Sequence, residues 1–198
     1  RIDRAGGTTW SRKTGDTAED VLKGHALIGD RVVAVGWRKN GSHRDVAALA
    51  MDLAGKQLWK VTWDNPGQDE ARAVVAGKEG AAAAVGVSGS RPLLVGFSKD
   101  GKVTFKVIDK THTKGELNDA VSLPLGAFAA AGTVVKGGAN DCARFFAKAD
   151  GSVAQVKTFG TGGNESCFGL TKHQAGFALV GREQFGTKSK MAIWRADS

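Results

Sequence analysis

Short apolar runs separated by turn residues recur along the whole chain. Between residues 68 and 105 an acidic turn leads into Ala-Val-Val, a turn with glycine, Ala-Ala-Ala-Val-Gly, a polar loop, Leu-Leu-Val-Gly-Phe, an Asp-Gly turn and Val-Thr-Phe. Four runs of strand length between turns predict a small antiparallel sheet of four strands. The runs are rich in β-branched and small residues, and no window has a helical amphipathic period, so we expect an all-β fold.

The same pattern returns four times. A glycine ends the second apolar run of each unit at Gly36, Gly86, Gly132 and Gly181, with intervals of 50, 46 and 49 residues. A second glycine, in the turn before the fourth run, recurs at Gly6, Gly55, Gly101 and Gly151. Four strands per unit and a period in the upper forties are typical of β-propeller blades.

The strands of each unit are named A to D, from the ring axis outward. We expect A strands at 19–24, 70–76, 117–123 and 166–172, and B strands at 30–36, 80–86, 126–132 and 175–181. We expect C strands at 46–52, 92–98, 142–148 and 190–196, and D strands at 8–13, 57–63, 103–108 and 153–159. The units cover 14–63, 64–109, 110–159, and 160–198 together with 6–13, which makes residues 1–198 a single domain.

The strands at which the repeat starts and stops indicate how a ring could close. The first D strand has no C strand before it, and the last C strand has no D strand after it. Pairing the two would remove two exposed edges and give a ring of four four-stranded blades, the last closed by the N-terminal D strand and the C-terminal A to C strands. The alternative is that the four repeats form part of a seven- or eight-bladed ring, completed by further sequence or by a second copy.

Composition changes this picture little, whereas charge adds to it. The 198 residues include 28 glycines and three prolines, which fits many tight turns. The formal net charge is +8, which favours anionic partners over neutral ones. Nucleic acid is not favoured, because no stacking motif or helix-turn-helix accompanies the charge. No apolar run approaches the roughly 20 residues of a transmembrane helix.

Two strings resemble a known family. They are Gly67-Gln68-Asp69-Glu70-Ala71-Arg72-Ala73-Val74 and Asp52-Leu53-Ala54-Gly55-Lys56-Gln57-Leu58-Trp59. They are similar to bacterial secreted β-propeller repeats of the SBBP type, whose units end in Asp-x-x-Gly-x-x-x-Trp. The likeness covers nearly the whole chain, with departures at Gln155, Asn118-Asp119 and Ser166-Cys167. The resemblance implies the propeller fold and export, and implies little about activity.

Candidate ligand-binding residues lie between the B and C strands. Loops on one face of a propeller vary freely on a rigid scaffold, and here these loops are basic. A positive rim would bind an anionic group. Two tryptophans on the same face, one in the first of these loops and one entering a D-to-A loop, would suit a sugar ring or a peptide aromatic. The alternatives are ordinary solubilising charges and packing tryptophans. The candidates are Arg38, Lys39, Arg44, Arg91, Lys136, Arg182, Lys188, Trp37 and Trp63.

Acids recur instead between the D and A strands, at Asp69, Glu116 and Glu165, which we expect to be equivalent. Oxygen ligands that converge on an axis could hold Ca²⁺. The alternative is that these acids close turns by accepting backbone hydrogen bonds. Cys142 and Cys167 open neighbouring C and A strands, so a disulfide between blades is feasible, with a reduced buried pair as the rival.

The leading hypothesis is an extracytoplasmic or secreted binding or scaffold propeller whose basic loop face engages an anionic glycan, an anionic polymer or a protein. One rival is a metal-assisted hydrolase or lyase with an axial acidic site. Another is a structural fragment of a larger surface protein or toxin, motivated by a chain that starts at Arg1. No catalytic residue is predicted, and oligomeric state is left open.

Overall fold

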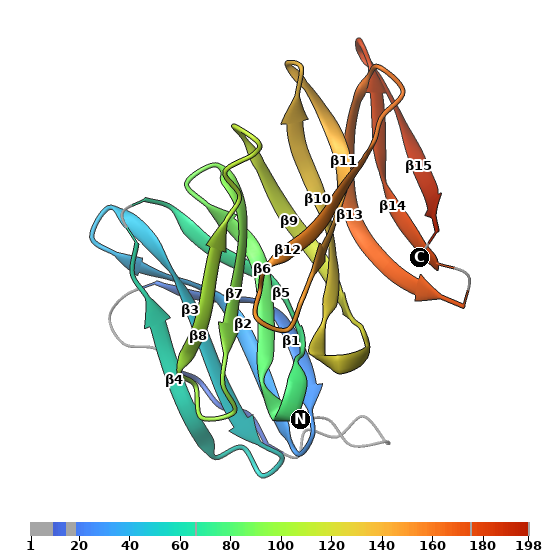
Figure 1. The fold of residues 1–198 in the computed structure, drawn as a ribbon. Coiled ribbons are helices and arrows are strands. Elements are labelled where there is room, and N and C mark those ends of the chain that lie inside the picture. Colours follow the sequence, from blue (N-terminus) through green and yellow to red (C-terminus); the bar gives the residue numbers. More distant parts are fainter. Residues whose placement is uncertain (1–9, 15–18, 66, 175, 198) are drawn as a thin grey trace.

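The computed structural model describes residues 10–14, 19–65, 67–174 and 176–197. Its strands form four consecutive antiparallel sheets that stand side by side in an arc, as Figure 1 shows. The all-β fold and the four-unit organisation are therefore confirmed. Closure of the ring stays a prediction. In the expected D strand at 8–13, residues 8 and 9 lie outside the described residues, and residues 10–13 have no strand assignment.

Each sheet follows the chain order of its strands. Sheet 1 contains β1 (Asp20–Ile28), β2 (Arg31–Asn40), β3 (His43–Asp52) and β4 (Gln57–Trp63). Sheet 2 contains β5 (Asp69–Ala76), β6 (Ala82–Ser88), β7 (Arg91–Phe97) and β8 (Val103–Ile108). Sheet 3 contains β9 (Gly115–Ser122), β10 (Phe128–Lys136), β11 (Ala139–Ala147) and β12 (Val153–Phe159). Sheet 4 has three strands in the described residues: β13 (Asn164–His173), β14 (Gly176–Phe185) and β15 (Lys188–Ala196).

Short 3-10 turns, η1 (Lys78–Gly80) and η2 (Pro124–Gly126), link the first two strands of sheets 2 and 3. The first strands of neighbouring sheets, β1, β5, β9 and β13, contact one another in sequence order. These four strands therefore form the inner edge of the arc, as predicted for the A strands. No helix among the described residues is long and apolar enough to cross a membrane.

The recurring glycine of the second strand has a steric cause. In every sheet the inner strand carries a β-bulge, after Leu22, Ala71, Leu117 and Cys167. The bulge pushes the carbonyl of the preceding residue against the glycine, so that a Cβ on Gly86 would lie 1.9 Å from the Glu70 oxygen. Gly36, Gly132 and Gly181 meet the equivalent carbonyls in the same way. Only glycine fits there, which is why it marks the repeat.

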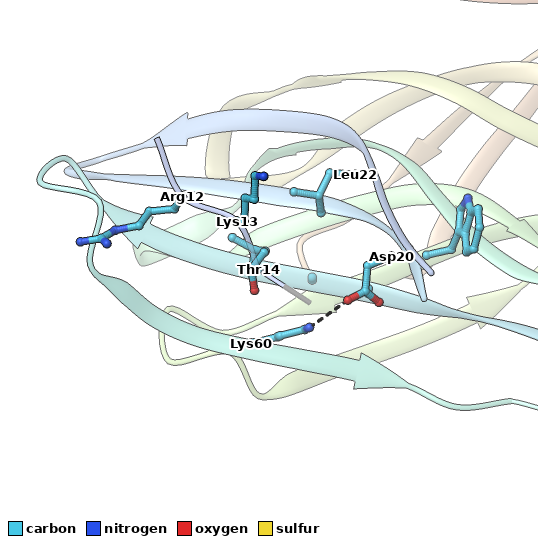
Figure 2. Close-up of a pocket in the computed structure, with 10 residues that line it drawn as sticks. Arg12, Lys13, Thr14, Asp20, Leu22 and Lys60 are labelled. Atoms are coloured by element: carbon cyan, nitrogen blue, oxygen red, sulfur yellow. Dashed lines mark hydrogen bonds and ion pairs between the residues drawn. The ribbon is translucent and has the colours of Figure 1, made fainter. Parts of the chain in front are cut away.

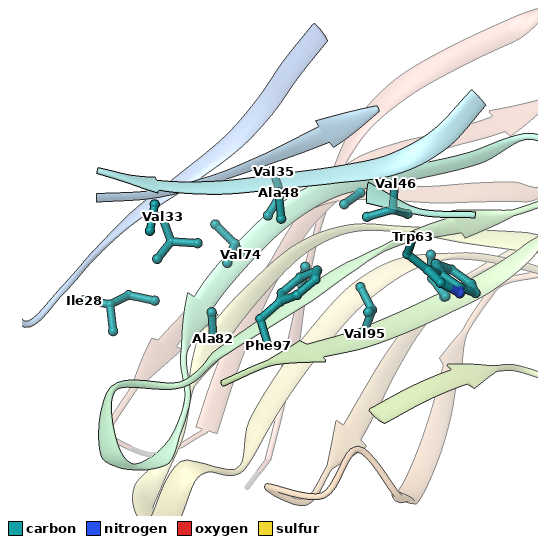
Figure 3. Packing of buried hydrophobic residues seen from close by; sticks show 14 residues of the cluster. Ile28, Val33, Val35, Val46, Ala48, Trp63, Val74, Ala82, Val95 and Phe97 are labelled. Carbon is teal, nitrogen blue, oxygen red and sulfur yellow. The ribbon is translucent and has the colours of Figure 1, made fainter. Parts of the chain in front are cut away.

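The core lies between the sheets. Val33, Val35, Val46 and Ala48 of sheet 1 pack against sheet 2, and Figure 3 shows these side chains meeting Val74, Ala82, Val95 and Phe97 across the interface. Two further clusters fill the space between sheets 2 and 3 and between sheets 3 and 4. Each sheet is thin, so it buries its apolar faces only by stacking on a neighbour.

Candidate functional site: a basic rim around an inner cavity

The expected basic loops are shorter than the sequence suggested. β2 runs to Asn40 and β3 begins at His43, so only Gly41 and Ser42 separate the two strands. The connections β6–β7, β10–β11 and β14–β15 are equally tight two-residue turns. The prediction that the candidate cations lie in B-to-C loops is therefore wrong, because they lie on strand ends. They still share one rim, because the turn between the second and third strands lies at the same end of every sheet.

Three cations come together where sheets 2 and 3 meet on this rim. The Ser90 carbonyl accepts a hydrogen bond from the Gly115 amide at 2.7 Å, and the Lys114 carbonyl accepts one from the Val135 amide at 2.9 Å. These two bonds hold Lys114 between Arg91, which follows Ser90, and Lys136, which follows Val135. All three side chains are exposed, and none has a carboxylate within ion-pair distance among the described residues. We call them the basic cluster.

An inner cavity of about 470 Å³ opens beside the basic cluster. Its volume falls within the usual range of ligand pockets. The Thr133 side chain lies in the cavity wall, and its buried hydroxyl has no hydrogen-bond partner among the described residues. The cavity is lined chiefly by polar and charged side chains, including those of Arg72, Ser90, Lys114, Glu116, Thr133 and Asn140.

Arg72 forms the wall of this cavity and organises the charges around it. Its guanidinium binds Glu70 at 2.7 Å and Glu116 at 2.8 Å, and it donates to the Asn118 side chain at 2.6 Å. Burial alone would raise the pKa of Glu70, but hydrogen bonds and charge from Arg72 and Lys23 outweigh it, so the pKa is lowered. Burial likewise opposes the charge of Arg72, but the two carboxylates raise its pKa. Both groups therefore stay ionised at neutral pH.

The other candidate cations divide into two groups. Arg38 and Arg44 are engaged, because Arg38 lies 3.8 Å from Asp20, and Arg44 lies 3.8 Å from Glu70 and stacks over the Trp37 ring at 4.1 Å. Lys39 on sheet 1 and Arg182 and Lys188 on sheet 4 are exposed at the rim. No described carboxylate pairs with these three, but they are not gathered with the basic cluster.

Both candidate tryptophans are buried. Trp37 is 4% exposed, and Trp63 is 8% exposed and belongs to the core between sheets 1 and 2. Stacking on a sugar needs an open ring face, so neither indole offers a binding surface in this structure, and packing explains both residues.

The three axial acids are not equivalent. Ala71 and Cys167 lie opposite the recurring glycines Gly86 and Gly181, two residues after Asp69 and Glu165, whereas Leu117 opposite Gly132 is one residue after Glu116. The prediction of equivalence is wrong for Glu116, because it occupies the position of Glu70 and a glycine occupies that of Asp69. Among the described residues no three His, Cys, Asp or Glu side chains form a metal-binding group, and the axial Ca²⁺ stays a prediction.

Each acid also has its own surroundings. Glu116 is held by Arg72, and Glu165 is fully buried and accepts hydrogen bonds from the Thr161 and Gly163 amides at 3.2 Å. Asp69 is fully buried, and its carboxylate oxygens have no hydrogen-bond partner among the described residues. Burial, with a smaller contribution from the charge of Asp45, raises the pKa of Asp69, and nearby Ser88 and Asn65 offset this only in part.

The cysteines form the expected link between blades. A disulfide joins Cys142 in β11 to Cys167 in β13, and both cysteines are fully buried between sheets 3 and 4. The reduced alternative is thereby excluded in this structure. A buried disulfide is typical of proteins that fold in an oxidising compartment.

Comparison with known proteins finds similar chains only among solved structures. No protein-family model and no curated protein matches the sequence. Among solved structures, the chain is similar to a candidate 6-phosphogluconolactonase from Bacteroides uniformis, with 16% identity and a TM-score of 0.46, over 86% of this chain and 55% of that one. It is also similar to an endo-arabinase from Bacteroides thetaiotaomicron, with 12% identity and a TM-score of 0.45, over 87% of this chain and 73% of that one. The chain thus spans about half the length of the first.

Proposed function

We propose that this chain is an exported binding or scaffold module, and that its basic rim engages an anionic glycan, an anionic polymer or an acidic surface of a protein. The observation that carries the proposal is the basic cluster. Arg91, Lys114 and Lys136 are exposed, unpaired with any described carboxylate, and fixed beside a polar cavity. Three exposed cations of one sign, without carboxylates paired to them, create a local positive potential that attracts anions.

The cluster and the cavity divide the task of recognition. The three cations supply long-range attraction and contacts to sulfate, carboxylate or phosphate groups, of which Arg91 can bind an oxyanion with two hydrogen bonds. The cavity supplies neutral polar groups, among them the Ser90 and Asn140 side chains, which suit hydroxyl or amide groups beside the charge. Export is supported by the Cys142–Cys167 disulfide.

Retention on a heparin column, a sulfated glycan probe, tests the proposal. The test variant replaces Arg91, Lys114 and Lys136 with Gln. The matched control replaces Lys56, Lys102 and Lys148, exposed residues of the turns at the opposite end of the sheets, so both variants lose the same charge. The test variant should elute at clearly lower salt than the control, because it has lost the cations that contact the sulfate groups, and salt screens the contacts that remain more easily. Equal elution of the two variants would show that only net charge matters and would overturn the proposal.

A further inference from the structure

Sheet 4 leaves an apolar face uncovered. One face of the sheet packs on sheet 3 through Leu179, Trp194 and Ala196. On the other face, Met191 is 97% exposed, Ile193 is 77% exposed, and Val180 is 45% exposed. Val180 and Ile193 are directly paired across β14 and β15, so these side chains form one continuous patch. An exposed apolar face of this kind marks an interaction surface.

The repeat identifies what this face is built to contact. Counting from Gly181 and from Gly36, Val180 is the equivalent of Val35, and Met191 and Ile193 are the equivalents of Val46 and Ala48. In sheet 1 those three residues are buried against sheet 2. The free face of sheet 4 therefore carries the half of the sheet-to-sheet interface that contacts a following sheet.

Sheet 1 carries the complementary half. Ala47 and Leu49 are the equivalents of Leu93 and Val95, which in sheet 2 pack toward the preceding sheet. In sheet 1 they are 5% and 4% exposed and line a cavity of about 300 Å³ together with Arg12, Lys13, Thr14 and Leu22; Figure 2 shows the labelled residues around it. This cavity lies on the face of sheet 1 that corresponds to the face by which sheets 2, 3 and 4 each pack against the preceding sheet.

Residues 10–14 occupy the place of an outer strand that belongs to such a preceding sheet. The Trp10 indole donates to the Leu53 carbonyl at 2.9 Å and covers Gly55. The Trp59 indole of sheet 1 likewise donates to the Lys99 carbonyl of sheet 2 at 2.9 Å and covers Gly101. The segment thus stands beside sheet 1 as β4 stands beside sheet 2. Sheet 4, in turn, is the one sheet that lacks an outer strand among the described residues.

The inner strands show that the two free faces match chemically. At the first two junctions the bulged residue of one sheet, Lys23 or Arg72, meets an acid of the next, Glu70 or Glu116. At the third junction the bulged Asn118 donates to the Cys167 carbonyl at 2.8 Å. In sheet 4 the bulged position holds Phe168, which is 55% exposed, and in sheet 1 the position of the acid holds Val21. The bulged position is apolar only in sheet 4, and the position of the acid is apolar only in sheet 1. These are the two sheets at the ends of the arc.

A second pair of positions matches in charge. Lys190 of sheet 4 is the equivalent of Asp45 and Asp141, and Asp20 of sheet 1 is the equivalent of Asp69 and Glu165. The first and third junctions therefore place an acid near an acid. The two free faces would instead bring Lys190 to Asp20, whose carboxylate lies 3.3 Å from Lys60 and 3.8 Å from Arg38 within one copy. Opposite charges favour this pairing and disfavour others.

We propose that the free face of sheet 4 binds sheet 1 of a second copy of this chain, and that two copies close head to tail into a ring of eight sheets. Residues 10–14 of each copy then complete sheet 4 of the other as its fourth strand. A second copy is favoured over closure within one chain because sheets 1 and 4 lie at opposite ends of the arc, with sheets 2 and 3 between them, as in Figure 1. Two identical junctions related by a twofold axis satisfy both faces of both copies.

The register of the new strand pair follows from the repeat. Trp10 corresponds to Trp59, which lies opposite Ala50, so Thr14 corresponds to Trp63, which lies opposite Val46. The equivalent of Val46 in sheet 4 is Met191. Thr14 of one copy is thus expected opposite Met191 of the other.

The mass of the protein in solution is the first test. Size-exclusion chromatography with light scattering should give twice 20.6 kDa for the wild type. Met191→Glu combined with Ile193→Glu should give a monomer with an unchanged circular-dichroism spectrum, because both side chains are exposed in one copy. Leu125→Glu, at an apolar residue that is 87% exposed on η2, is the control and should remain a dimer. A monomeric wild type, or larger open assemblies, would overturn the proposal.

A cross-link distinguishes the two ways of closing the ring. Thr14→Cys combined with Met191→Cys should form, on mild oxidation, a species of twice the chain mass on a non-reducing gel, and neither single variant should form it in comparable yield. A cross-link within one chain would show a ring of four sheets closed by its own N-terminal strand, and would contradict the proposal. Failure to cross-link while the native disulfide forms would contradict the register and the interface.

Discussion

Arg72 of β5 binds the carboxylate of Glu116 of β9 at 2.8 Å, and so ties the inner strand of sheet 2 to that of sheet 3. The same guanidinium holds Glu70, which Lys23 of sheet 1 approaches at 3.1 Å. One arginine therefore connects three successive sheets along the inner edge of the arc. Its side chain is also part of the cavity wall beside the basic cluster, so the stability of the arc and the shape of the candidate site depend on the same residue.

Replacing Arg72 with Met should destabilise the protein by about 2 kcal/mol, because the nearly buried Glu70 loses its main hydrogen-bond donor. The measurement is the free energy of unfolding in urea at neutral pH. Lys78→Met is the matched control. Lys78 pairs with Glu79 on the surface, where both side chains are largely exposed, and such pairs contribute little. Equal effects of the two substitutions would show that the inner network does not hold the sheets together.

The neighbouring acid Asp69 should make stability depend on pH in the opposite sense to Glu70. Burial raises the pKa of Asp69, so the folded state binds its proton more tightly than the unfolded state does. This contribution to stability is present below the ordinary aspartate pKa of about 4 and is lost as pH rises through the folded pKa. Because the pKa of Glu70 is lowered, its contribution is present above the ordinary glutamate pKa and is lost as pH falls.

Asp69→Asn isolates the first of these effects. Because the raised pKa means that ionisation of the buried carboxyl group costs stability, the substitution should become more favourable to the folded state as pH rises from 4 to 7. Urea unfolding of wild type and variant at a series of pH values gives the difference directly. Asp100→Asn, at an exposed turn position, controls for the loss of one charge. A variant less stable than the wild type at every pH would mean that Ser88 and Asn65 stabilise the ionised form.

The sequence predicted the outer strands better than the middle ones. The strands expected at 57–63, 103–108 and 153–159 match β4, β8 and β12, because an Asp-Gly type turn fixes where each begins. The second and third strands extend several residues further than expected, as at Arg38 and Arg44. Their apolar pattern stops where the neighbouring sheet ends, but the hydrogen bonds of the hairpin continue past that point. Polar side chains on a strand that extends beyond the hydrophobic core therefore resemble a loop in the sequence.

The basic cluster could be predicted only in part. Arg91 and Lys136 are candidates because they lie in the expected basic B-to-C loops, whereas no sequence pattern singles out Lys114, two residues before Glu116. Its position depends on backbone hydrogen bonds from residues far along the chain, Ser90 and Val135, which no local pattern reveals. The burial of Trp37 and Trp63 has the same origin. Both follow an apolar strand into polar residues, and only the neighbouring sheet covers them.

Gly86 provides a sharp test of why the repeat needs its glycine. Gly86→Ala should cost about 2 to 3 kcal/mol, because the new Cβ would meet the Glu70 carbonyl oxygen at 1.9 Å and the backbone must shift. Gly89→Ala is the control. It has open space around it but a φ of +63°, and should cost about 1 kcal/mol from backbone strain alone. A smaller loss at Gly86 than at Gly89 in urea unfolding would contradict the steric explanation of the motif.

The Cys142–Cys167 disulfide should account for a large share of the stability of sheet 4. It closes a segment of 25 residues and joins β11 to β13, across the last sheet-to-sheet interface. A cross-link of this length restricts the unfolded chain by about 3 kcal/mol. Cys142→Ala combined with Cys167→Ala should lower the unfolding free energy by that amount, and should remove the effect of a reducing agent on thermal unfolding.

The wild type treated with reductant supplies the comparison for that variant. Its melting temperature should fall toward the value of the double variant, while the double variant itself should not respond. Sheet 4 packs on sheet 3 through Leu179, Phe177 and Trp194 as well, so the fold should persist without the disulfide, with sheet 4 the first part to exchange its amide hydrogens. If reduction leaves the melting temperature and the exchange of β13 to β15 unchanged, packing alone holds the last sheet, and the disulfide contributes nothing to its stability.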